Sequence, residues 1–122
     1  MQNSKFKVDL KTRCYKFSLN TIALADTLPS KRSVWIIIDQ LIRAATSIGA
    51  NLIEARASSS RLEFKKFYEI ALKSANETKY WLCLLRDTGL ANKNAVNELL
   101  AEAVEISNML ASGVLKLKNK KF

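Results

Sequence analysis

The side chains of this sequence that are best suited to chemistry are its cations. Of the 122 residues, 20 are Lys or Arg and 11 are Asp or Glu, which gives a formal net charge of +9. The chain has no histidine, and histidine is the side chain that most often serves as a general base, activates a Ser or Cys nucleophile or ligates a transition metal. We therefore expect a protein that binds an anionic partner, with no enzyme activity, no metal site and no cofactor.

Most of the positive charge is predicted to gather at one end of the molecule. If the chain forms four antiparallel helices, its N-terminus, the connection between the second and third helices and its C-terminal tail meet at the same end. We call this end the basic pole, and its cations are Lys5, Lys7, Lys11, Arg13, Lys16, Arg56, Arg61, Lys65, Lys66, Lys116, Lys118, Lys120 and Lys121. These 13 cations, less the three anions Asp9, Glu54 and Glu63, predict a charge of +10.

A surface of this kind predicts contact with the phosphate backbone of a nucleic acid, with RNA as the first expectation. Binding through Lys and Arg depends strongly on salt and little on base sequence. The residues expected to make these contacts are Lys5, Lys7, Lys11, Arg56, Arg61, Lys65, Lys66, Lys118 and Lys120. An acidic protein partner, or a basic surface that serves only solubility, stays open as an alternative.

Other polar and aromatic residues each have a structural and a functional interpretation. Asn51 and Glu54 lie three residues apart near the basic pole, where they form part of a binding surface or contact a neighbouring helix and a nearby cation. For Glu77, a polar contact between helices is favoured over a role as a catalytic acid. Trp35 and Trp81 could stack on bases, but their positions near the opposite end favour packing or an oligomer contact.

The apolar residues recur at helical spacing and predict four helices, at about 9–28, 32–57, 60–88 and 93–118. Pro29 is expected to end the first helix and Gly89 the third. The expected N-terminal caps are Ser30 or Ser33 for the second helix, Ser59 or Ser60 for the third, with Glu63 completing a capping box, and Asn92 or Asn94 for the fourth. The predicted fold is all-α: one domain, 1–122, forming an antiparallel up-down-up-down four-helix bundle.

Several short features refine this expectation. The serines at 58–60 either cap the third helix or bind phosphate at its start. Gly49, inside the second helix, predicts a close helix crossing or a kink. Cys14 and Cys83 are far apart without CxxC spacing, the N-terminus has no apolar signal-peptide core, and no apolar run reaches the roughly 18 residues of a membrane span. We expect a cytoplasmic protein with free thiols and no membrane contact; a disulfide between Cys14 and Cys83 is the disfavoured alternative.

The apolar stripes are wider than a small monomeric bundle needs. Beside the main seams lie Trp35, Ile36, Tyr80, Leu100, Val104, Ala111 and Leu115. Exposed apolar patches often mark partner surfaces, so we expect a homo-oligomer; a wide core in a monomer is the alternative.

The stretch from Ser47 to Leu90 resembles a known bacterial family. SIGANLIEA, followed by SSSRLEFKKFYEIALKSANETKYWLCLLRDTGL, is similar to the S-[IV]-x-x-N-x-x-E-A, S-x-x-[ED]-F and A-x-E-T-x-[YF]-W-L patterns of the four helix bundle proteins, also called 23S rRNA intervening-sequence proteins. The upstream pieces LPS and QLIRAATS agree. Asn51 and Glu54 match the most characteristic positions of that family. The accessory variability determinants of diversity-generating retroelements belong to the same superfamily and also resemble this chain.

The resemblance implies a four-helix bundle that assembles as a ring-like homopentamer. For the retroelement branch it also implies binding to a reverse transcriptase and its template RNA, and it carries over no catalytic residue. Many relatives have proline where Gly49 stands and glycine where Arg56 stands, so this chain looks like a divergent branch. We expect an oligomeric, RNA-binding accessory protein without enzyme activity; the alternative is a protein scaffold that recognises a partner such as a reverse transcriptase without touching nucleic acid.

Overall fold

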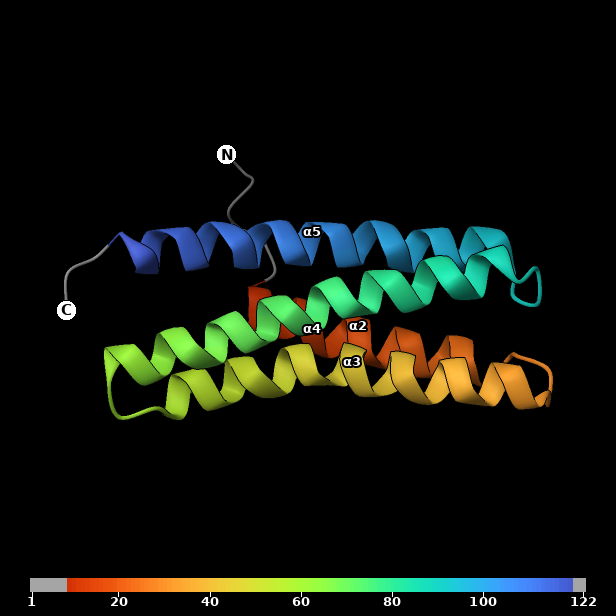
Figure 1. Cartoon of the computed structure of the whole chain (residues 1–122), viewed down its shortest axis with the longest axis horizontal. Helices are drawn as coiled ribbons and strands as arrows, with labels where there is room; N and C mark the ends of the chain where they lie inside the picture. Colours follow the sequence, from red (N-terminus) through yellow and green to blue (C-terminus); the bar gives the residue numbers. More distant parts are fainter. Residues whose placement is uncertain (1–8, 120–122) are drawn as a thin grey trace.

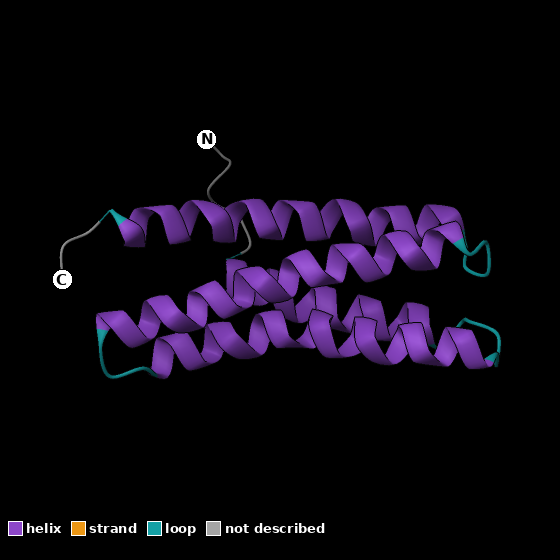
Figure 2. Cartoon of the chain, in the orientation of Figure 1, coloured by secondary structure: helices purple, strands orange, loops and turns teal. Residues whose placement is uncertain are grey.

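The apolar stripes fold into four long helices in the computed structural model of the chain, which describes residues 9–119. The helices are α2 (Leu10–Ala25), α3 (Arg32–Ala57), α4 (Arg61–Asp87) and α5 (Lys93–Lys118). Each helix packs against the next in the sequence, α5 packs against α2, and successive helices run in opposite directions (Figure 1). The described residues contain no strand (Figure 2). The predicted all-α four-helix bundle is confirmed.

Three of the helices begin at a side-chain cap, because the first N–H groups of a helix have no partner within it. The Asp9 carboxylate accepts from the N–H of Thr12 at 2.8 Å. Ser60 Oγ accepts from the N–H of Glu63 at 3.0 Å, and Asn92 Oδ1 accepts from the N–H of Ala95 at 2.9 Å. The sequence had left two candidates for each of α4 and α5, and Ser60 and Asn92 are the ones that cap.

The cap predicted for the second helix is wrong. Lys31 is the N-cap residue of α3 and makes no side-chain capping bond, so neither Ser30 nor Ser33 caps the helix. The N–H of Lys31 donates to the carbonyl of Pro29 at 3.0 Å. This tight turn brings the chain into the helix after Ser30 and before Ser33 can act as a cap.

The helix ends also follow local hydrogen bonds. α2 ends at Ala25, three residues before the predicted end at Leu28, because the N–H and hydroxyl of Thr27 both donate to the carbonyl of Leu24, at 3.0 and 2.7 Å. α4 is followed by Gly89 at φ 75°, a left-handed conformation that favours glycine and ends helices. The predicted role of Gly89 is confirmed.

The helices cross closely at Gly49. A Cβ atom placed on Gly49 would lie 3.4 Å from the Cβ of Cys14, which is buried on α2. α3 continues through this position as one helix. Of the two expectations for Gly49, the structure shows the close crossing.

The first helix is much shorter than the others, and this shapes one end of the bundle. α2 has 16 residues, whereas α3, α4 and α5 have 26, 27 and 26; at 1.5 Å per residue, α2 is roughly 15 Å shorter. It therefore starts part-way along the bundle (Figure 1). Along the inner seam of α4, Ala71 and Ala75 are fully buried, but Phe64 and Tyr68, which line a cavity beside the start of α2, are only half-buried.

Among the described helices, α3 alone is long and apolar enough to cross a membrane by length and composition. The core helix of a soluble bundle passes the same test. Here Leu41, Ala45 and Ile48 of α3 are completely buried against the neighbouring helices.

Candidate nucleic-acid interface

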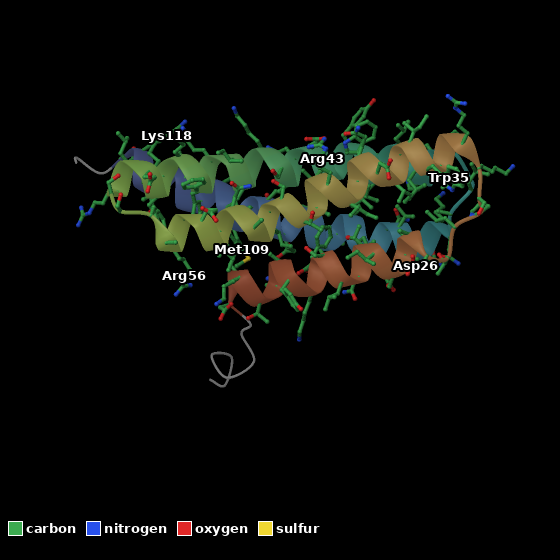
Figure 3. The ribbon with its side chains drawn as sticks, turned by 90° about the horizontal axis from the view of Figure 1, so that it is seen from below. Asp26, Trp35, Arg43, Arg56, Met109 and Lys118 are labelled. Carbon is green, nitrogen blue, oxygen red and sulfur yellow. The ribbon has the colours of Figure 1, made fainter. Side chains whose placement is uncertain are left out.

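Six cations of the described chain lie at the end of the bundle where α3 meets α4 and α5 finishes. We call them the basic cluster: Arg56, Arg61, Lys65, Lys66, Lys116 and Lys118. Because α4 and α5 are antiparallel, the start of one lies beside the end of the other, and Arg56 and Lys118 appear together at this end (Figure 3). Lys65 is half-buried and the other five are exposed. Glu54 and Glu63 are the acidic residues closest in sequence to the cluster, which leaves a net charge of +4.

The ion pairs of the described chain all lie outside the basic cluster. Arg13 pairs with Glu102 at 2.7 Å, Arg43 with Glu77 at 2.6 Å and Arg86 with Asp87 at 3.0 Å. Within residues 9–119, no hydrogen bond or ion pair occupies the side chain of any member of the cluster. Its positive charge is therefore available to an external anion.

Arg13 does not belong to the available positive surface, contrary to the prediction. Its Nε and Nη2 donate to the two carboxylate oxygens of Glu102 at 3.0 and 2.7 Å. This bidentate bond raises the pKa of Arg13 and neutralises its charge locally. Lys11 is still free: it is exposed and lines a cavity together with Arg56. Lys5, Lys7 and Lys120 lie outside the described residues.

The start of α4 is occupied by a carboxylate of the chain itself. The Glu63 Oε1 atom accepts from the N–H of Ser59 at 2.9 Å, while the N–H of Glu63 donates to Ser60 Oγ at 3.0 Å. This is the expected capping box, except that the Glu63 carboxylate accepts from the N–H of Ser59 and not from that of the cap residue Ser60. Since Glu63 already fills part of this N–H cluster, the structure favours the capping interpretation of the serines over phosphate binding there.

The family-motif residue Asn51 joins a hydrogen-bonded chain between α3 and α4. Its Nδ2 donates to the carbonyl and to the Oγ of Ser47, at 2.8 and 2.9 Å. Ser74 Oγ of α4 donates to Ser47 Oγ at 2.9 Å. Asn51 itself bonds only Ser47 of its own helix, so the expected direct contact with a neighbouring helix is not seen among the described residues; the link to α4 is made by Ser47. Glu54 is exposed and makes no hydrogen bond or ion pair with another described residue, so its expected pairing with a nearby cation is not seen.

Glu77 makes the polar contact between helices that its position predicted. Its Oε2 accepts from Arg43 Nη2 of α3 at 2.6 Å and from the Trp81 indole N–H at 2.9 Å. Trp81 is half-buried, whereas the side chain of Trp35 is 62% exposed and lies at the end of the bundle opposite Arg56 (Figure 3). Within residues 9–119, no three His, Cys, Asp or Glu side chains are grouped to hold a metal ion.

Two aromatic residues beside the basic cluster were missed by the sequence reasoning. The rings of Phe64 and Tyr68 stack with their centroids 5.6 Å apart and their planes 21° apart. Burial raises the pKa of the Tyr68 hydroxyl, so it stays protonated at neutral pH. Both residues lie on the apolar seam of α4. The signal that could have pointed to them is the short first helix, because within residues 9–119 α2 covers less of the seam at this end.

The comparisons with known proteins agree with the fold. The profile of the 23S rRNA-intervening sequence protein family matches residues 7–112. A protein of unknown function from the S23 ribosomal protein family of Bacteroides thetaiotaomicron, known from a crystal structure, is 33% identical in sequence to this chain. The match has a TM-score of 0.81 and covers 87% of this chain and 98% of that chain. Among curated proteins, none matches this chain. Since the profile spans most of the sequence, the chain belongs to the 23S rRNA-intervening sequence protein family.

Proposed function

We propose that this protein is an oligomeric accessory protein that binds the phosphate backbone of RNA through its basic cluster and catalyses no reaction. One observation carries the proposal. The six cations of the cluster converge from three helices onto one end of the bundle, and within residues 9–119 none of them forms an ion pair, whereas the ion pairs are made elsewhere. Cations left without partners in this way favour a polyanion, because binding releases the counterions condensed on its phosphates.

The proposal is tested by the salt dependence of RNA binding. For a single strand, the logarithm of the affinity falls with the logarithm of the salt concentration by about 0.7 per phosphate neutralised, so full use of the six cations gives a slope of about −4. We expect the triple variant Arg61→Glu, Lys65→Glu, Lys66→Glu to bind far more weakly and to lose roughly half of this slope. Fluorescence anisotropy with a labelled single-stranded RNA measures both quantities.

A matched control distinguishes a local contact from an effect of net charge. Lys31, Arg32 and Lys93 are exposed at the opposite end of the bundle, and reversing all three changes the net charge by the same amount. This control variant should keep most of the affinity and the wild-type slope. Absence of binding at low salt, or equal losses in the two triple variants, would contradict the proposal.

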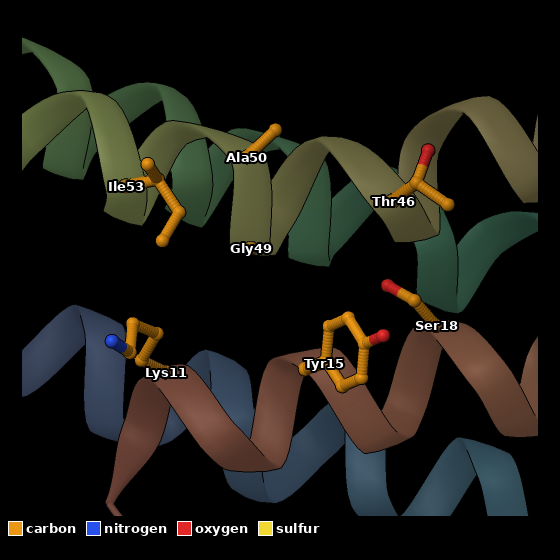
Figure 4. Close-up of a pocket in the computed structure, with 7 residues that line it drawn as sticks. All are labelled: Lys11, Tyr15, Ser18, Thr46, Gly49, Ala50 and Ile53. Carbon is orange, nitrogen blue, oxygen red and sulfur yellow. The ribbon is translucent and has the colours of Figure 1, made fainter.

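A groove between α2 and α3 supports the oligomeric part of the proposal. It has a volume of about 340 Å³ and an almost wholly apolar lining that includes Tyr15, Gly49, Ala50 and Ile53. In Figure 4, Lys11 and Tyr15 of α2 lie across the groove from Gly49 and Ile53 of α3. Tyr15 is 67% exposed and Ile53 50%, an exposure of large apolar side chains that contact with another copy would relieve. Ile53→Lys should then reduce the mass of the assembly, as measured by light scattering.

A second candidate function rests on the apolar surface at the opposite end. Trp35, Ile36 and Tyr80 are exposed by 62%, 55% and 61%, and such a surface suits a protein partner. In this alternative the protein is a scaffold that recognises a partner such as a reverse transcriptase without touching RNA. It predicts that Trp35→Ser abolishes capture of the partner from nuclease-treated lysate, while the triple charge reversal of the basic cluster does not.

A further inference from the structure

A small cavity lies beside the start of the short helix α2 in the part of the chain that the structure describes. It has a volume of about 210 Å³ and lies beside Arg56 of the basic cluster. Its lining residues come from the start of α2, the end of α3 and the start of α4: Asp9, Leu10, Lys11, Leu52, Ala55, Arg56, Phe64 and Tyr68. A longer first helix would fill this position.

One wall of the cavity is aromatic and held in place. The rings of Phe64 and Tyr68 are nearly parallel, at 21°, with their centroids 5.6 Å apart. The Tyr68 ring also packs closely on Gly113 of α5. A Cβ atom placed on this glycine would lie only 2.5 Å from Cε2 of the ring. Both rings are only half-buried, so each keeps accessible surface. Leu52 and Ala55 add an apolar floor that is itself buried.

The rim of the cavity carries charged groups that suit a nucleotide. Arg56 and Lys11 are exposed, and neither side chain has a hydrogen-bond or ion-pair partner within residues 9–119. Asp9 has the opposite charge; its Oδ1 accepts the N–H of Thr12, and its Oδ2 has no hydrogen-bond donor among the described residues. A phosphate would be repelled by Asp9 and attracted by Arg56 and Lys11, whereas the N–H groups of a base edge could donate to the Asp9 carboxylate.

We propose that this cavity receives one unpaired base of a single-stranded RNA, stacked against Phe64 and Tyr68, with a neighbouring phosphate held by Arg56 and Lys11. The inference rests on the proposed RNA binding and adds a preference for single strands. The volume is below the roughly 300–1,000 Å³ of pockets for drug-sized ligands, which suits a single planar ring system. Aromatic side chains bind bases through their faces whatever the base sequence, and a base paired within a duplex is not available for this contact.

The experiment compares three labelled probes of equal length on the full-length protein: a single-stranded RNA, the same strand annealed to its complement, and an abasic strand. The abasic strand keeps the phosphates but has no base to stack. Phe64→Leu retains apolar volume and removes the aromatic face. We expect it to weaken binding of the single strand by about tenfold, within the range that one stacked base contributes, and to leave the abasic strand unchanged. Tyr80→Leu, an exposed tyrosine outside the cavity and outside the basic cluster, is the matched control.

Each other outcome has a distinct meaning. If Phe64→Leu binds the single strand as well as the wild type does, while the charge reversal at Arg61, Lys65 and Lys66 weakens it, the base cavity is wrong and the RNA-binding function stands. If Phe64→Leu weakens binding of the single strand and the abasic strand equally, its effect is structural and the inference is overturned. If no probe binds at low salt, the proposed function itself fails. If Phe64→Leu changes the mass of the assembly, the cavity is a contact between copies and the inference also fails.

A second measurement needs no variant. Photocrosslinking of the wild-type protein with a single-stranded RNA containing 4-thiouridine should give adducts on peptides that contain Phe64 or Tyr68. The same RNA in a duplex should give far fewer adducts at these residues. Crosslinks confined to other parts of the protein would refute the inference even if Phe64→Leu did not fold.

Discussion

The close crossing of α2 and α3 at Gly49 offers a test of the bundle's packing by a single methyl group. Gly49 lies inside α3, where replacement of glycine by alanine gains about 1 kcal/mol of helix propensity. The added Cβ would lie 3.4 Å from the Cβ of Cys14 and 3.9 Å from its carbonyl carbon, which is ordinary van der Waals contact and requires no movement of α2. We therefore expect Gly49→Ala to raise the free energy of unfolding by about 0.5–1 kcal/mol.

For a domain of this size, such a gain corresponds to an increase in Tm of roughly 2–5 °C. Thermal and urea unfolding followed by far-UV circular dichroism would measure it. Protein concentration must be matched, because Gly49 also lines the groove in Figure 4 and any effect on assembly would change the apparent stability. Light scattering on the same samples separates the two effects.

Replacing either of the other two glycines by alanine is an internal control, because its expected effect on the free energy of unfolding differs from that of Gly49→Ala. A Cβ on Gly113 would lie 2.5 Å from Cε2 of Tyr68, so the ring must move, and this overpacking of about 1–3 kcal/mol offsets the helix-propensity gain. Gly89 has φ 75°, where a side chain costs about 1–2 kcal/mol. A Gly49→Ala protein less stable than the wild type would mean that α2 and α3 pack more closely than described. A Gly113→Ala protein as stable as Gly49→Ala would refute the packing of Tyr68 on α5.

Two further predictions concern a buried thiol and a helix cap. Burial raises the pKa of the Cys14 thiol from its ordinary 9.0 to about 12, so its thiolate fraction at pH 8 falls to about 10⁻⁴. In single-cysteine variants, Cys14 should react with Ellman's reagent at least a hundredfold more slowly than the half-buried Cys83, and equal rates would contradict its burial. Because folding favours the protonated thiol, stability should fall as pH rises from about 9 towards 12, and Cys14→Ala should weaken this dependence. Ser60→Ala should lower the free energy of unfolding by about 1 kcal/mol, whereas Ser30→Ala and Ser33→Ala should change it by less than about 0.5 kcal/mol, as measured by urea unfolding.

The regular parts of the fold could be predicted because they depend on local and periodic signals. The seam of α4 repeats at helical spacing through Ala71, Ala75, Thr78, Leu82 and Leu85, all buried in the structure. Ser60 with Glu63, and Gly89 in its left-handed conformation, are set by hydrogen bonds within a few residues. Such signals are present in the sequence itself, so the helices and most of their limits follow from it.

The errors have a common physical origin in contacts that the sequence pattern does not contain. The cap of α3 depends on the turn after Pro29, which bonds the N–H of Lys31 instead of leaving it to a serine. Whether the charge of Arg13 is free to bind an external anion depends on Glu102, which is 89 positions away in the sequence and bonds it across the α2–α5 contact. A list of cations therefore overstates the positive surface, because only the packed structure shows which charges are already neutralised.

The residues that carry the family resemblance and the residues that carry the proposed function are different sets. Asn51 and Glu77 lie in the motifs, and in the structure they tie α3 to α4 through Ser47 and Arg43. Their positions thus account for a shared fold and say nothing about what the fold binds. The resemblance implies that many relatives have glycine where Arg56 stands, and here Arg56 belongs to the basic cluster and lines the cavity beside Phe64. If that cavity receives a base, then Arg56→Gly should weaken binding of single-stranded RNA more than a loss of one exposed charge elsewhere, and relatives with glycine at this position should share the fold and lack this part of the affinity.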